Sequence, residues 1–253
     1  MPEWLILTLV TAGVCVLVLA ATLLNQRRVP EDDDPSETPD VIEYMTMMIG
    51  VVYAIVLGLA IAGVWEARGA AQDGVRTEAQ ALHEVSERAG NYPAPVRDRI
   101  RADARAYADH VVSKEWRVMI DKGELTDRGT TLLARLRKDV TDYTPRTDRE
   151  WQTFQPLVEQ VAAVDAAREA REQNAGPTLP AVVWLGLAVG AALVIGLLFT
   201  LQIRRTPREL AMAVMFSALI VFLLFLVWDF DAPFGRSVGD ASSPFTDLFP
   251  DPR

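Results

Sequence analysis

The sequence contains few of the residues that build metal sites and covalent cross-links. It has one cysteine, Cys15, and two histidines, His83 and His110, which lie far apart in the chain. A single cysteine excludes a disulfide within the chain and a site built from several thiolates. The aspartates at residues 32–34 lack the alternating spacing and the glycine of a calcium loop. We therefore predict no metal site and no cofactor.

Lysine is also scarce. Lys114, Lys122 and Lys138 are the only lysines, and the arginines are interspersed with acidic residues. The net charge at pH 7 is −9. Proteins that bind nucleic acids carry basic patches or stripes, so we predict no nucleic-acid partner.

Catalytic motifs are absent from the sequence as well. It contains no Ser-x-x-Lys, Gly-x-Ser-x-Gly or His-Glu-x-x-His motif and no glycine-rich phosphate loop. We therefore name no catalytic residue and do not expect an enzyme.

Long apolar runs are the main feature of the sequence. Half of the residues are apolar, and they gather in four runs at residues 4–24, 44–65, 179–203 and 210–228. Runs of about 20 apolar residues span a bilayer as helices, because a helix satisfies its own backbone hydrogen bonds in lipid. No ionisable residue lies at the centre of a run, which argues against a proton-coupled transporter. The first run lacks the basic start of a signal peptide, so it is interpreted as a retained anchor.

The predicted fold class is an all-α membrane protein with four transmembrane helices and a helical soluble domain inserted between helices 2 and 3. The transmembrane helices are placed at residues 1–25, 44–65, 177–203 and 210–228. An acidic flexible loop (26–43), the soluble domain (66–176), a short basic loop (204–209) and a C-terminal tail (229–253) connect or follow them.

Apolar residues at helical spacing predict the helices of the soluble domain. The first continues out of the second transmembrane helix to about residue 89, and others cover about 95–120, 127–140 and 150–174. Gly123 is expected to end the second. Thr147 and Glu150 have the spacing of a capping box and predict the start of the last.

Small residues recur at a spacing of four in two membrane runs. Gly50, Ala54, Gly58 and Ala62 lie in the second, and Gly186 and Gly190 lie in the third. Such spacing lets helix backbones approach closely. The second helix is therefore predicted to face a pore or the other subunits of a homo-oligomer, although chance in alanine-rich helices remains open for the glycine pair.

Arginines predict the orientation of the chain. Arg27 and Arg28 follow the first run, and Arg204, Arg205 and Arg208 lie between the last two. The positive-inside rule places both short loops in the cytoplasm. We therefore expect a multi-pass protein of the cell membrane with an extracytoplasmic soluble domain.

Several short motifs, in order along nearly the whole chain, resemble the bestrophin-like family of bacterial membrane proteins. They lie in the second membrane run and its exit, in the soluble domain and the third run that follows it, and after the last run. Their residues are Gly50, Tyr53, Gly58 and Trp65, then Glu78, Tyr107, Glu115 and Trp116, then Arg168 and Arg171 before Trp184, then Asp231, Pro233 and Phe234.

The resemblance implies a pentameric anion channel whose second helix lines the pore. Gly50, Tyr53, Ala54 and Gly58 would then belong to the pore or the subunit-packing face. It also implies a cytoplasmic soluble part, which is opposite to the orientation that the arginines predict.

Two functional hypotheses follow. The first is an oligomeric ion channel, with anions as the candidate ions. The second is a membrane-anchored sensor or scaffold whose helical domain binds a ligand or a protein partner. Tyr107, Glu115 and Trp116 could form a binding site, but core packing is the favoured interpretation.

Overall fold

The computed structural model describes residues 40–198, 207–234 and 242–250, with isolated positions before residue 40. Within those ranges the chain forms helices and no strand. The helices are α2 (Asp40–Arg88), α3 (Ala94–His110), α4 (Trp116–Lys122), α5 (Asp127–Thr141), α6 (Asp148–Gln173), α7 (Ala181–Leu198), α8 (Pro207–Phe230) and α9 (Ser243–Leu248). The predicted first transmembrane helix and most of the acidic loop lie outside the described residues.

The chain divides into two units. One comprises Met1–Trp65 and Leu179–Asp231, and the other comprises Glu66–Thr178 and Ala232–Arg253. We call them the apolar unit and the helical unit. The division falls within α2, which is one uninterrupted helix. The prediction that the helix of the second apolar run continues directly into the following segment is therefore confirmed.

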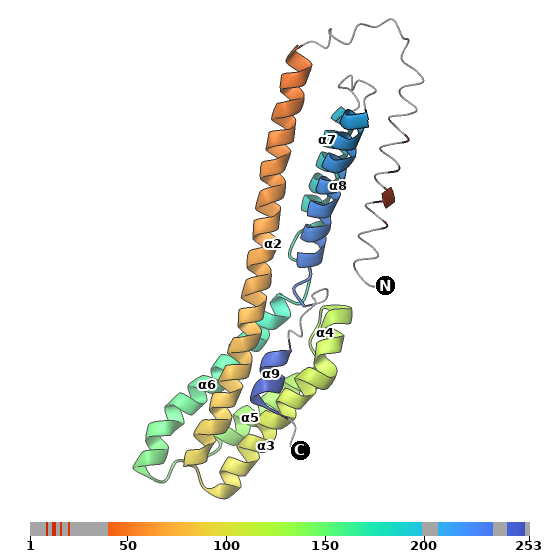
Figure 1. Ribbon diagram of the computed structural model, residues 1–253. Coiled ribbons are helices and arrows are strands. Elements are labelled where there is room, and N and C mark those ends of the chain that lie inside the picture. The colour runs from red at the N-terminus through yellow and green to blue at the C-terminus, as the bar shows by residue number, and fades with distance from the viewer. Residues whose placement is uncertain are drawn as a thin grey trace, which may run out of the picture. The chain divides into compact units, whose positions relative to one another are not determined.

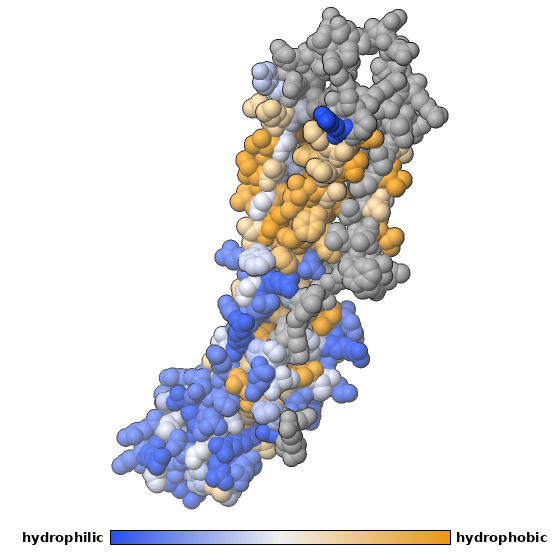
Figure 2. Space-filling model, in the orientation of Figure 1, coloured by the Kyte–Doolittle hydropathy of each residue, from blue (hydrophilic) through white to orange (hydrophobic). Residues whose placement is uncertain are grey.

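The apolar unit consists of the first part of α2 with α7 and α8. Its core is formed by one face of α2, with Tyr53, Leu57 and Val64, packed with side chains of α7 and α8. Figure 1 shows α7 and α8 side by side, and Figure 2 shows apolar side chains over the visible surface of these helices. The helices Tyr44–Asn91 and Leu210–Phe230 are long and apolar enough to cross a membrane, and Ala181–Leu197 is a shorter apolar helix.

The helical unit packs the rest of α2 with α3, α4, α5, α6 and α9 around a second core. In Figure 1, α3 and α5 run beside one another. As predicted, α5 begins near residue 127, and Thr147 caps α6 by accepting a hydrogen bond from the Glu150 amide, with an N···O distance of 3.3 Å. The carboxylate of Glu150 accepts from the Arg146 amide at 2.7 Å, which closes the preceding loop.

The sequence predicted a single helix at about residues 95–120, and this prediction is wrong in detail. A π-helical turn, Val111–Glu115, separates α3 from α4. Such a turn inserts one extra residue into the helical repeat and shifts the faces that follow it. Gly123 ends α4 in the left-handed region with φ 70°, a conformation that glycine adopts without steric cost.

The C-terminal segment contributes to the helical unit, although it was predicted only as a tail. Phe234 and Phe245, the latter in α9, are buried in the core of this unit. The ring of Phe249 also lies edge-on to His83, with centroids 5.9 Å apart.

Candidate functional site

Tyr53 fixes the contact between α2 and α7 in the apolar unit. Its side chain is 8% exposed, and its hydroxyl donates a hydrogen bond to the Leu187 carbonyl at 3.1 Å. Its ring lies directly against Gly190, where an added Cβ would stand 2.6 Å from two ring carbons. Gly190 is therefore needed for this close approach. Gly186 has open space where a Cβ would be, so only one glycine of the pair serves this contact.

The repeated small residues of α2 lie on a different side of the helix. Ala54, Gly58 and Ala62 are exposed, and an added Cβ at Gly50 or Gly58 would meet nothing within 4 Å. We call Ala54, Gly58 and Ala62 the small-residue face. No described part of the chain covers it, so the structure divides the predicted packing set into an internal contact at Tyr53 and an uncovered face.

The motif residues at the ends of the apolar helices have separate roles. Trp65 is exposed, with its ring edge-on to Phe230 at 5.1 Å between centroids. The buried Asp231 carboxylate accepts hydrogen bonds from the Leu179 amide at 2.7 Å and from the indole of Trp184 at 3.0 Å. Asp231 thus holds the backbone just before α7.

In the helical unit, Pro233 is buried, and Phe234 contacts Trp116 edge-on with ring centroids 5.6 Å apart. The guanidinium carbon of Arg171 lies 5.9 Å from the centroid of the Trp116 ring. Trp116 therefore joins the C-terminal segment to the polar interior of this unit.

Five buried side chains form a charge cluster inside the helical unit: Glu78 of α2, Tyr107 of α3, Glu115 of the π-helical turn, and Arg168 and Arg171 of α6. None is more than 8% exposed. The cluster holds two carboxylates and two guanidinium groups, so its formal charges cancel.

Each charge in the cluster is paired by short hydrogen bonds. Arg168 binds Glu115 with two parallel N–H donors, at 2.5 and 2.9 Å. Arg171 binds Glu78 in the same way at 2.7 and 3.0 Å, and it also donates to Glu115 at 2.8 Å. Bidentate pairs of this kind are strong and directional.

Tyr107 connects the two ion pairs. Its hydroxyl donates to the Glu78 carboxylate at 2.5 Å and accepts from Arg168 at 3.2 Å. Burial, followed by the charge of Glu78, raises the pKa of Tyr107 well above its usual range. The phenol therefore stays protonated and acts as a donor to Glu78.

Glu115 stays ionised in its buried position. Burial by itself raises the pKa of Glu115, but the hydrogen bond from Arg168 and the charge of Arg171 outweigh it and lower the pKa to about 2. Thr126 adds two donors, its amide at 3.2 Å and its hydroxyl at 2.7 Å. The Thr126 hydroxyl donates its one proton to Glu115 and accepts a hydrogen bond from the Gly129 amide. Its remaining lone pair can only accept, so Nε2 of His110, 2.7 Å away, is the donor in that contact.

Gly129 allows the cluster to close. An added Cβ there would overlap the Glu115 carboxylate and stand 2.7 Å from a guanidinium nitrogen of Arg168. The start of α5 can lie this close to the ion pair only without a side chain.

The sequence predicted core packing around Tyr107, Glu115 and Trp116, and the structure places all of them in the interior or at its edge. It did not predict that two arginines pair with Glu78 and Glu115. Arg168 and Arg171 continue the face of α6 that carries Val161 and Val164. Two charged residues on an otherwise apolar helix face are the feature of the sequence that could have predicted a buried ion pair.

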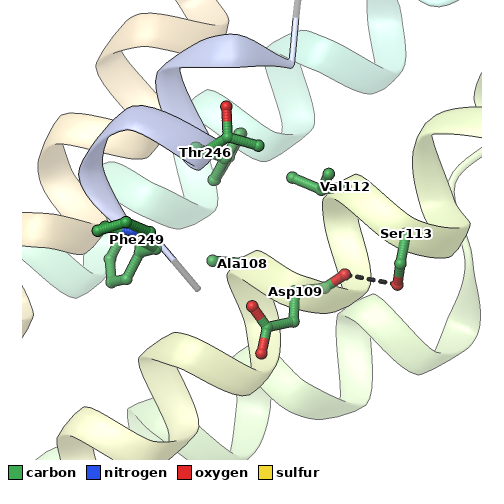
Figure 3. Close-up of a pocket in the computed structure, with 8 residues that line it drawn as sticks. Ala108, Asp109, Val112, Ser113, Thr246 and Phe249 are labelled. Carbon is green, nitrogen blue, oxygen red and sulfur yellow. Dashed lines mark hydrogen bonds between the residues drawn. The ribbon is translucent and has the colours of Figure 1, made fainter. Parts of the chain in front are cut away.

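An open groove of about 590 Å³ lies elsewhere in the helical unit, between α3 with its π-helical turn and α9. Figure 3 shows Val112 and Phe249 at its sides and Ser113, whose hydroxyl donates to the Asp109 carbonyl at 2.6 Å. Asp109 is the charged residue among those that line it. The two hydroxyl side chains that line the groove, Ser113 and Thr246, donate to backbone carbonyls of their own helical turns. Among the described residues, no group of His, Cys, Asp or Glu could hold a metal ion.

A model of the family described as the Bestrophin-like domain matches residues 12–244. The fold is similar to that of a mutant of a bacterial bestrophin homologue from Klebsiella pneumoniae, with 13% identity, 97% of this chain and 98% of that chain covered, and a TM-score of 0.67. A crystal structure described as a membrane protein has a TM-score of 0.69 at 14% identity, covering 95% and 98% of the two chains. No curated protein matches. At these identities the structural similarity shows the fold.

Proposed function

The chain is a membrane protein of the bestrophin-like family, and we propose that it forms an oligomeric ion channel, with anions as the permeant ions. The observation that carries this proposal is the small-residue face of α2, which no described part of the chain covers. One α2 helix cannot enclose a pore, so the proposal requires a homo-oligomer. The choice of anions rests on the family resemblance.

The membrane arrangement is part of the same proposal. We propose four transmembrane helices, formed by the first apolar run, the first part of α2, α7 and α8. Large apolar side chains of α2, α7 and α8 are exposed to their surroundings, among them Val51, Leu59, Leu185 and Met215. Such surfaces suit lipid or the neighbouring subunits.

Small side chains favour a pore wall for a simple steric reason. Ala54, Gly58 and Ala62 keep the side chains small over about two turns of one side of α2, so several copies of this face can surround an open path. The tyrosine on the other side of α2 is bound to α7 through Leu187. The same helix therefore presents a packed side to its own chain and an unfilled side to a pore.

Ion flux into liposomes tests the proposal. The purified protein should form an oligomer in detergent and admit chloride into vesicles. Gly58→Phe should abolish this flux by filling the path, whereas Leu185→Phe, at an exposed apolar position of α7, should leave it unchanged. A monomeric protein, or equal flux through both variants, would refute a pore at this face.

The alternative is a membrane sensor or scaffold. The uninterrupted course of α2 from Asp40 to Arg88 favours it as a means of transmitting a signal. A protein that is monomeric and admits no ions, but whose helical unit captures a partner, would support this second function.

A further inference from the structure

Most of the buried residues of α2 lie along one stripe of the helix, and Ala79 and Ala81 flank it on either side. The stripe includes Tyr53, Leu57 and Val64 in the apolar unit and Val75 and Glu78 in the helical unit. At about 100° per residue, these positions fall within roughly 40° of Tyr53 around the helix axis. The small-residue face is about 100–180° away from Tyr53 by the same measure. Whatever holds the stripe in place therefore sets the direction of the small-residue face.

Glu78 is the charged residue of this stripe, and its contacts are directional. Its carboxylate accepts from Nε and Nη2 of Arg171 and from the hydroxyl of Tyr107, at 2.7, 3.0 and 2.5 Å. Apolar neighbours tolerate small rotations of a helix, because dispersion contacts have little angular preference. Hydrogen bonds weaken steeply once donor and acceptor are misaligned.

Rotation of α2 would also leave a buried charge without one of its partners. Glu78 is fully buried, and its two partners belong to α3 and α6. Turning α2 about its axis would withdraw the carboxylate and leave Arg171 with Glu115 as its one remaining carboxylate in the cluster. Breaking a buried pair in this way is strongly unfavourable.

We propose that Glu78 is a positioning residue for conduction. Its bonds to Arg171 and Tyr107 fix the rotation of α2 about its own axis, and this rotation determines the direction in which the small-residue face points. The inference rests on the proposed channel function, because it concerns how the pore-lining face is oriented.

The test measures helix rotation and flux in the same full-length protein. Single cysteines at Ala54, Val56, Gly58 and Ala62, in a Cys15→Ser background, carry spin labels. Their accessibility to oxygen and to a water-soluble nickel complex varies around the helix, and the phase of that variation reports its rotation. The phase is then compared between Glu78→Gln and a control, Glu84→Gln, which removes an exposed carboxylate from the same helix.

We expect Glu78→Gln to shift the phase and to lose most of the chloride flux, while Glu84→Gln changes neither. Arg171→Lys keeps the charge without the two-donor geometry and should give a smaller shift. An unchanged phase in Glu78→Gln would overturn the proposal, whether flux is kept or lost. If Glu78→Gln does not fold, Tyr107→Phe gives the same comparison, because it removes one bond to Glu78 and keeps every charge. Absence of flux in the unmutated protein would refute the channel, whereas the phase would still decide whether Glu78 orients α2.

Discussion

Removal of one arginine from the charge cluster gives the sharpest test of how the helical unit is held together. In Arg168→Met, the methionine fills much of the same space, but Glu115 loses both hydrogen bonds from the guanidinium. Breaking a buried ion pair by removing one partner costs about 3–5 kcal/mol, because the remaining charge stays buried. Glu115 keeps Arg171 and the two donors of Thr126, so we expect the lower end, about 3 kcal/mol.

Unfolding of the purified protein in detergent, followed by the fluorescence of its tryptophans, measures this loss. Arg76→Met is the matched control, since Arg76 and its partner Asp73 are 62% and 74% exposed. An exposed pair contributes about 0–1 kcal/mol. Equal losses in the two variants would show that the cluster does not hold the unit together. The double variant Arg168→Met with Glu115→Gln should recover part of the loss, because no unpaired charge remains.

Three further outcomes are expected. Gly190→Ala should destabilise the protein by about 1–3 kcal/mol, because its methyl group would overlap the Tyr53 ring, whereas Gly186→Ala should be nearly neutral in the same unfolding assay. The pKa of Glu115 in the folded protein is about 2, below its ordinary 4.5. The contribution of ionised Glu115 to the free energy of unfolding is therefore fully present above pH 4.5 and should be lost as the pH falls from there toward 2. When the free energy of unfolding is measured at decreasing pH, the parent protein should therefore show this loss and Glu115→Gln should not. A cysteine at Thr141, in a cysteine-free background, should react with an impermeant thiol reagent in intact cells if the arginine-based orientation holds; reaction only after lysis would place the helical unit in the cytoplasm.

Helix positions followed from the sequence because they depend on local patterns. The periodic apolar residues after residue 66, the Thr147 cap and the terminal Gly123 each act within a few residues of their position. The π-helical turn could not be predicted, because Val111 and Val118 are seven residues apart and fit an ordinary helix. The turn ends at Glu115, which pairs with Arg168 and Arg171 of a distant helix, a contact that the local pattern does not contain.

The charge cluster escaped prediction for a related reason. Glu78 and Arg171 are separated by 93 residues, and Arg168 and Glu115 by 53. Each of these side chains has other charges nearby in the sequence, which is also the pattern of a solvated helix surface. Only packing of α6 against α2 and α3 removes them from water, and no local rule reports that packing.

Stability alone does not account for such a cluster. Replacing a buried ion pair by apolar residues of similar size is often neutral or stabilising, so a helical unit of this size could be held by leucines as well. Contacts between apolar side chains have little angular preference, however. A continuous helix such as α2 needs contacts with an angular preference if one of its sides must face a particular way. Glu78 has three donors aimed at it from two other helices, and it lies on the same stripe as Tyr53, whose hydroxyl is also bound. If Glu78 sets the rotation of α2 as proposed, Tyr53 and Glu78 act together, because hydrogen bonds at two places on one stripe oppose rotation more strongly than apolar contacts do.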